Sequence, residues 1–272
     1  MFYGSSIIQD RFPVLEDKYL SPYVIENVII DVKPHSHHDF DYIKEVLGKF
    51  SIRVMQLRFF GEFNFGLIVS VLTIFKAANI ESIEVIVSDL FKHIQLQKIV
   101  KASNKLTSLY LFNSSRDRTL TQDQCIIVFV KESVMGSHSC GKVSHGNLTC
   151  NKSLFYEAQH INTCLNKKIS IDSAGQVKNC PSMIQTFGRY DDVDFSKLIN
   201  SDEYKLLWNI TKDEISVCKD CEYRYMCTDC RVFLSEPSNI YSKPSKCSYN
   251  PYLGLWRGDD GWISSEDWLK EK

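Results

Sequence analysis

The chain has 272 residues, of which 44% are hydrophobic, 12% aromatic and 24% charged. That length suits one large domain or two modest ones, and the hydrophobic content is ample for a packed core. The formal net charge of −1 gives no general attraction to nucleic acid or to an anionic membrane, so we expect neither as a partner.

The N-terminal sequence MFYGSSIIQDRF lacks the basic region and apolar core of a secretory signal peptide. The longest apolar run, Phe65–Phe75, is shorter than the ~20 residues that a helix needs to cross a bilayer. We therefore expect a cytoplasmic protein. In that reducing compartment, clustered thiols are more often metal ligands than disulfides.

The first 135 residues alternate predicted strands and helices. β-branched and apolar runs predict strands at residues 23–32, 51–60, 82–87, 106–112 and 125–130. Between them, three- and four-residue apolar spacing predicts helices at residues 39–47, 65–78 and 90–103. This alternation predicts an α/β domain with a parallel sheet. About 130 residues are too few for a complete eight-fold barrel, typically ~250, so we expect a partial barrel or an open sheet.

The composition becomes polar near Gly136, which predicts a second, loop-rich domain over residues 136–258 and a C-terminal tail over residues 259–272. Residues 168–171 and 176–178 flank Asp172-Ser-Ala-Gly175, a hairpin signal in which Gly175 can take a positive φ. Cys164 and Cys180 bracket this hairpin, and we expect the bend to bring both sulfurs to one end. Short helices are predicted at residues 194–198 and 203–210.

All ten cysteines lie at or beyond Cys125, which itself sits in an apolar strand and is expected to be an inert buried thiol. The segment CKDCEYRYMCTDC places four cysteines within thirteen residues, and Cys-x2-Cys pairs can grip one metal centre. Zinc ribbons usually place a longer loop between their pairs than the five residues found here. Nine cysteines from Cys140 onward also exceed the needs of one zinc, whereas two four-iron clusters would use eight. Structural zinc stays open as the alternative.

The frame Cys164-x10-Gly175-x4-Cys180, Cys218-x2-Cys221-x5-Cys227, Cys230 and Cys247 resembles the SPASM domain, found at the C-terminus of many radical-SAM peptide-modifying enzymes. That domain typically holds two auxiliary [4Fe-4S] clusters. The segments HINTCLNKKISIDSAGQVKNCPSM, FGRYDD, LLWNITKDEISVCKDCEYRYMCTDCR and YSKPSKCSYNPY are similar to the SPASM peptide maturase of grasp-with-spasm systems. The resemblance covers roughly residues 21–252 and is specific in its second half. It implies two partners, a precursor peptide and an ATP-grasp peptide ligase.

The resemblance also implies two ligand sets. One cluster would be held by Cys218, Cys221, Cys227 and Cys247. The other would take Cys164, Cys180 and Cys230, with a fourth ligand from Cys140 or Cys150; Gly141 favours Cys140, because glycine suits a cluster-binding turn. The chain departs from the family pattern in one place. Two residues, Thr228 and Asp229, precede Cys230 where the usual domain has three.

The radical-SAM signature Cys-x3-Cys-x2-Cys occurs nowhere in the sequence. We therefore do not expect S-adenosylmethionine as a cofactor or radical generation by this chain alone, and whether it is an enzyme stays open. The N-terminal barrel could be a shortened version of the family's. We expect an iron–sulfur protein that binds the precursor peptide and presents it to the ligase. The alternatives are a catalytic maturase that needs a partner and a zinc-stapled binding module.

Two expectations concern the side chains around the clusters. Arg224 lies inside the cysteine loop, where it could contact cluster sulfide or a substrate carboxylate, or form an ordinary salt bridge. Tyr223 and Tyr225 are expected to shield the clusters from water. Asn162 and Lys178, beside predicted ligands of the second cluster, are expected to affect its potential.

Overall fold

The computed structural model describes residues 21–134, 136 and 139–272, and it divides the chain into two compact units. The sheet unit comprises the described residues of 21–139 together with 167–204. The cysteine unit comprises residues 140–166 and 205–272. Within the described ranges, no helix combines the length and the apolar character that crossing a membrane requires.

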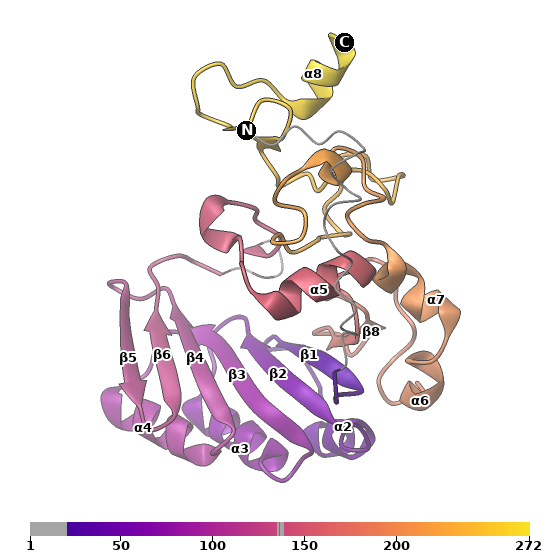
Figure 1. The fold of residues 1–272 in the computed structure, drawn as a ribbon. Helices are drawn as coiled ribbons and strands as arrows, with labels where there is room; N and C mark the ends of the chain where they lie inside the picture. Colours follow the sequence, from indigo (N-terminus) through magenta and orange to yellow (C-terminus); the bar gives the residue numbers. More distant parts are fainter. Residues whose placement is uncertain (1–20, 135, 137–138) are drawn as a thin grey trace. The chain divides into compact units, whose positions relative to one another are not determined.

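The sheet unit is built on an open, mixed sheet of eight strands (Figure 1). They are β1 (Ile25–Val32), β2 (Ile52–Phe59), β3 (Ile80–Ser88), β4 (Leu106–Phe112), β5 (Arg118–Gln122), β6 (Cys125–Phe129), β7 (Lys168–Ile171) and β8 (Val177–Lys178). Their order is β5-β6-β4-β3-β2-β1-β7-β8, so β5 and β8 form the edges. All neighbours are parallel except the pairs β5–β6 and β7–β8. The predicted α/β class and open sheet are confirmed.

Three helices follow β1, β2 and β3 in the chain and cover one face of the sheet (Figure 1). They are α2 (Phe40–Leu47), α3 (Phe65–Phe75) and α4 (His93–Ala102). Crossovers of one hand between strands that advance in one direction place their helices on the same face. Each helix buries a stripe spaced by three or four residues, such as Ile68, Val71, Leu72 and Phe75 of α3. These stripes pack over fully buried strand residues, including Leu57, Val85 and Leu109.

The structure divides the chain differently from the predicted boundary at residue 136. β7 pairs in parallel with β1, with Asn27 opposite Lys168 and Ile30 opposite Ile171, and so extends the sheet. Residues 167–204, which include α6 (Phe195–Leu198), therefore pack with the first unit. The sheet also contains β5, which the sequence analysis missed because RTLTQ is polar and its residues are largely exposed.

The last residues form more structure than the predicted tail. α8 (Ser265–Lys270) is capped by Ser264, whose hydroxyl accepts from the Asp267 N–H. Ser265 is 1% exposed, and Lys243 Nζ donates to its hydroxyl at 2.7 Å. The segment is thereby attached to the body of the cysteine unit.

The predicted hairpin forms between β7 and β8. The Asp172 carboxylate accepts from the N–H groups of Ala174 and Gln176 at 2.9 and 3.0 Å, which tightens the turn. Gly175 has a φ of +84°, as expected, and a Cβ there would lie 3.1 Å from Cε1 of Tyr190. Both the backbone conformation and the close ring favour glycine at this position.

We predict that Gly175→Ala destabilises the protein by about 1 kcal/mol or more, because alanine is strained at positive φ and its methyl group would press on Tyr190. The measurement is urea unfolding followed by circular dichroism. Gly146→Ala is the control, since a Cβ at Gly146 meets nothing within 4 Å. Equal midpoints for the two variants would contradict this account of the turn.

Candidate functional site

The cysteine unit contains little regular structure. It has three 3₁₀ helices, η2 (His145–Asn147), η3 (Leu206–Asn209) and η4 (Cys218–Asp220), and two α-helices, α5 (Lys152–His160) and α8. The strands β9 (Tyr249–Asn250) and β10 (Leu255–Trp256) form an antiparallel pair. Helix α7 (Asp202–Lys205) ends at Lys205, where the second stretch of this unit begins. Ile210, Ile215 and Cys218 form a small hydrophobic cluster, against which Leu207 packs. Tyr156, Leu165, Trp208 and Tyr249 are further buried residues of this unit.

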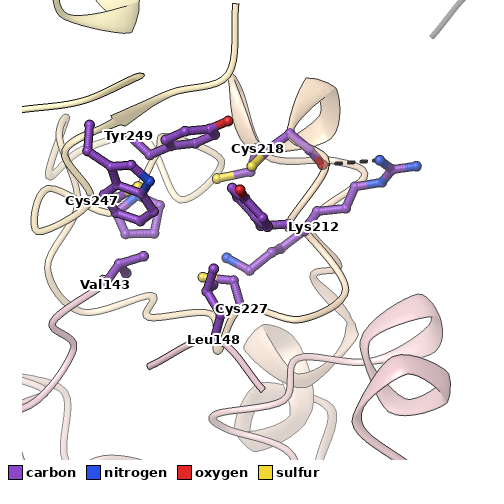
Figure 2. A pocket seen from close by; sticks show the side chains of 12 residues that line it. Val143, Leu148, Lys212, Cys218, Cys227, Cys247 and Tyr249 are labelled. Carbon is purple, nitrogen blue, oxygen red and sulfur yellow. Dashed lines mark hydrogen bonds between the residues drawn. The ribbon is translucent and has the colours of Figure 1, made fainter. Parts of the chain in front are cut away.

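Four of the predicted ligands line one cavity in this unit (Figure 2). Its empty volume is about 370 Å³, a figure that includes part of its open mouth. The lining residues come from three stretches of the chain: Val143 and Leu148; Lys212, Cys218, Cys221, Tyr223, Arg224 and Cys227; and Pro244, Cys247, Tyr249 and Trp256. The structure thus brings Cys218, Cys221, Cys227 and Cys247 to a common space, as the resemblance implied.

Short backbone contacts set the positions of these four cysteines. The Cys221 N–H donates to the Cys218 carbonyl at 3.0 Å, and the Arg224 N–H donates to the Cys221 carbonyl at 3.2 Å. Immediately before Cys218, Val217 has a φ of +67°, which is unusual for a β-branched residue. Cys247 joins this loop from a distant segment, where a parallel β-bridge pairs it with Val143.

A second group of thiols lies around Cys230. Burial raises the pKa of Cys230, the N–H groups of Phe233 and Val232 oppose that shift, and the charges of Cys164 and Cys140 raise it further. A Cβ added to Gly141 would come within 3.2 Å of the Cys230 sulfur, so the Cys140-Gly141 backbone packs directly on that thiol. The Cys140-Gly141 segment therefore lies directly beside Cys230.

The two remaining candidates lie elsewhere. Cys150 is exposed, and the preceding Thr149 N–H donates to the Met226 carbonyl at 2.9 Å, which places it beside the other cysteine loop. Cys180 is 8% exposed and follows β8 in the sheet unit. The assignment of Cys180 to the second ligand set stays a prediction. Cys125 in β6 is fully buried, as expected.

One buried carboxylate connects the two thiol groups within the cysteine unit. Asp229, between Cys227 and Cys230 in the chain, is 2% exposed. It accepts from Asn162 Nδ2 at 2.6 Å, from Arg231 Nη2 at 2.7 Å and from Lys212 Nζ at 3.3 Å. Asn162 in turn accepts from the Cys164 N–H at 3.0 Å. From the sequence, Asp229 was only one of the two residues that separate Cys227 from Cys230, and no role was predicted for Lys212.

Lys212 places a buried positive charge at the wall of the cavity. Its side chain is 4% exposed, and its ammonium end points towards the Cys227 sulfur (Figure 2). Burial by itself would lower the pKa of Lys212. The negative charge of Asp229 outweighs burial and raises this pKa. The ion pair with Asp229 thus favours the protonated, cationic form of the lysine.

Aromatic rings form another part of the wall. Tyr249 packs against both Tyr223 and Trp256, with centroid separations of 5.1 and 4.8 Å. Trp256 Nε1 is buried, and it finds no hydrogen-bond partner among the described residues. Tyr223 lines the cavity, as a shielding role requires, whereas the hydroxyl of Tyr225 donates to Asp213.

Arg224 forms the ordinary salt bridge that was one of its two expected roles. Its Nε lies 2.8 Å from Asp213 Oδ1. Its Nη1 donates to the Cys221 carbonyl at 3.2 Å, the contact dashed in Figure 2. Arg224 thus braces the backbone of the loop that carries Cys221.

Burial disfavours the thiolate form of three of the four cavity cysteines, Cys218, Cys221 and Cys227. Burial raises the pKa of Cys218 to about 11 and that of Cys221 to about 12. Binding to a metal requires the thiolate, so metal uptake here must release protons. Across the described ranges, no three or more His, Cys, Asp or Glu side chains form a group suited to a single metal ion.

We predict that the metal-free protein loses stability as the pH rises from about 9 towards 11–12. Below their ordinary pKa of 9.0, Cys218 and Cys221 are protonated in both states, and their contribution is fully present. Above it, the unfolded thiols ionise first, which costs the folded state about 1.4 kcal/mol for each unit of pKa shift. The measurement is the free energy of unfolding against pH under reducing conditions.

A Cys218→Ala/Cys221→Ala double variant serves as the control for this pH dependence. Its curve should be flatter over the same range, whatever its absolute stability. A wild-type curve that is already flat between pH 9 and 11 would contradict the protonated, buried thiols described above.

Comparison with models of protein families, with curated proteins and with solved structures finds no match to this chain. No family is therefore assigned, and the function has to be proposed from the chain's own residues.

Proposed function

We propose that this chain is an iron–sulfur protein that takes part in the maturation of a ribosomally synthesised peptide together with an ATP-grasp ligase. The observation that carries the proposal is the cavity lined by Cys218, Cys221, Cys227 and Cys247. The resemblance to the SPASM domain implies this same set of four as the ligands of one cluster. Their convergence from a tight run and a distant segment supports that assignment.

The donors around the cavity fit a [4Fe-4S] cluster. Four thiols line a shared space, and four thiolates are the ligand set that such a cluster takes. A cluster takes its thiolates around a body larger than a single ion, whereas structural zinc draws four ligands to one point at ~2.3 Å for sulfur. Trp256 Nε1 and the Lys212 ammonium add N–H donors of the kind that hydrogen-bond to cluster sulfur.

Within the cysteine unit, Cys140, Cys164 and Cys230 are proposed as ligands of a second cluster, for which the resemblance also implies Cys180. Packing of the Cys140-Gly141 backbone on Cys230 supports Cys140, in preference to Cys150, as the fourth ligand. Gly141 has a φ of +78°, and a side chain there would clash with the Cys230 sulfur at 3.2 Å. Glycine beside Cys140 thus allows the two cysteine segments to approach each other.

Clusters of this type supply electron transfer and structural support when bound. The protein's residues contribute ligation, burial and a fixed cation. Tyr223, Tyr249 and Trp256 exclude water from one side of the cavity, and Lys212 keeps its proton. Because the sequence contains no Cys-x3-Cys-x2-Cys motif, we propose that the chain does not generate a radical alone.

The free edge of the sheet at β5 is suited to binding an extended peptide. Residues 118–121 of this strand are exposed, and β6 pairs with its other side in an antiparallel register. Leu120 of β5 is 45% exposed, which offers an apolar contact beside the unpaired edge. Addition of a peptide strand to such an edge supplies affinity through backbone hydrogen bonds. We propose β5 as the binding edge for the precursor peptide.

We predict that Cys221→Ala lowers the iron and acid-labile sulfide of anaerobically prepared protein by about half, because one of two clusters is lost. The same variant should lower the thermal stability, since metal binding contributes directly to folding in small metal-dependent units. Cys125→Ser is the control: it removes a fully buried thiol of the sheet unit and should leave the iron content unchanged.

The outcome separates the proposed clusters from zinc. Brown protein with iron and sulfide supports the proposal, and unchanged iron in Cys221→Ala contradicts the ligand assignment. Colourless protein with stoichiometric zinc would replace the proposed function by a zinc-stapled binding module.

We also predict that the full-length chain captures its precursor peptide and the ATP-grasp ligase at micromolar concentrations. Leu120→Lys should weaken capture of the peptide, because a charge on an edge strand opposes addition of another strand. Leu253→Lys, at a residue of similar exposure (38%) in the cysteine unit, is the matched control. Wild-type protein that captures neither partner would contradict the proposed role in peptide maturation.

A further inference from the structure

The buried cation at the cavity wall has a fixed position. Lys212 is 4% exposed, and its ammonium group lies 3.3 Å from the Asp229 carboxylate. Asp229 also accepts from Asn162 and Arg231, so this carboxylate cannot turn away without losing buried hydrogen bonds. The ammonium is consequently held on the side of the cavity that Cys227 and Cys218 occupy.

The charges of this network do not cancel. Lys212 and Arg231 contribute two positive charges against the single negative charge of Asp229, which leaves one net positive charge. All three side chains are at most 4% exposed, so water screens this charge poorly. The network therefore presents a positive potential to whatever fills the cavity.

A second donor lies in the same wall. Trp256 Nε1–H is buried and has no acceptor among the described residues, although buried indole N–H groups usually find one. Trp256 lines the cavity together with Lys212. An anionic occupant with sulfur acceptors would satisfy this donor and balance the charge of the network.

We infer that Lys212, supported by Trp256, is a positioning residue that raises the reduction potential of the cluster bound by Cys218, Cys221, Cys227 and Cys247. This inference rests on the proposed function. It assigns to this site the task of accepting an electron, and it identifies the buried network around Asp229 as the device that makes acceptance easier.

The physical reason is the change of charge on reduction. If Cys218, Cys221, Cys227 and Cys247 held a cluster, its one-electron reduction by a low-potential donor would break no bond. The site then carries one more negative charge, which a nearby buried cation stabilises more than it stabilises the oxidised form. Hydrogen bonds to cluster or cysteine sulfur act in the same direction.

The test is a redox titration, monitored by electron paramagnetic resonance, of the anaerobically prepared full-length chain. We expect Lys212→Met to keep its iron and sulfide and to shift one reduction potential to a more negative value. Lys212→Arg, which keeps the charge, should have a reduction potential close to that of the wild type. Trp256→Phe, which removes only the N–H donor, should produce a smaller negative shift.

Lys219→Met is the matched control. Lys219 directly follows Cys218, yet it is exposed to solvent, so its charge is screened and its loss should leave both potentials nearly unchanged. Equal shifts in the Lys212 and Lys219 variants, or unchanged potentials in Lys212→Met with iron retained, would overturn this inference alone. Wild-type protein without iron would overturn the proposed function and this inference with it. If Lys212→Met does not fold, Lys212→Gln replaces it, and an unchanged potential in that variant with its iron retained would equally overturn the inference. No shift in Trp256→Phe counts against the donor role.

Discussion

The organisation of the cysteine unit depends on the buried carboxylate of Asp229. Burying a charge is costly unless it is paired and hydrogen-bonded, and Asp229 obtains contacts from Asn162, Lys212 and Arg231. These three partners come from three segments that each carry or adjoin a predicted ligand. Asn162 orients the backbone at Cys164, Lys212 faces Cys227 and Cys218, and Asp229 itself precedes Cys230. Removing this carboxylate would therefore leave two buried cations and disturb both thiol groups.

The cysteine unit combines little regular structure with most of the chain's cysteines and a buried polar network. Loop-rich units often gain stability from a bound metal or from disulfides. All ten cysteines lie within the described ranges, and none of them forms a disulfide there. A bound metal would thus supply folding energy as well as chemistry, in keeping with the proposed clusters.

The sheet unit is stabilised in another way. Its strands and helices bury apolar faces, and the chain returns to it as β7 after residues 140–166. Pairing of β7 with β1 satisfies the backbone groups of β1 on its second side, which would otherwise be a sheet edge. The hairpin then continues to β8 and to Cys180. Cys180 therefore belongs to the sheet unit.

Much of this arrangement could be predicted from the residues. The strands from β1 to β4 and the helices between them follow from local periodicity, and the Gly175 turn follows from residue chemistry. The set Cys218, Cys221, Cys227 and Cys247 followed from its spacing through the resemblance. These features depend on neighbours in the sequence or on a strict repeat of residue types, so no folding of distant segments is needed to identify them.

Other features were decided only by tertiary structure. β5 is too polar to be identified as a strand, and it forms because β6 offers it backbone partners. Residues 167–204 belong to the sheet unit because β7 pairs with β1, which is distant in the sequence: Lys168 lies opposite Asn27. The burial of Lys212, its pairing with Asp229 and the packing of Gly141 on Cys230 likewise arise between distant segments. The sequence determines which charged residues and thiols are present, but their burial and their contacts depend on how distant segments pack together.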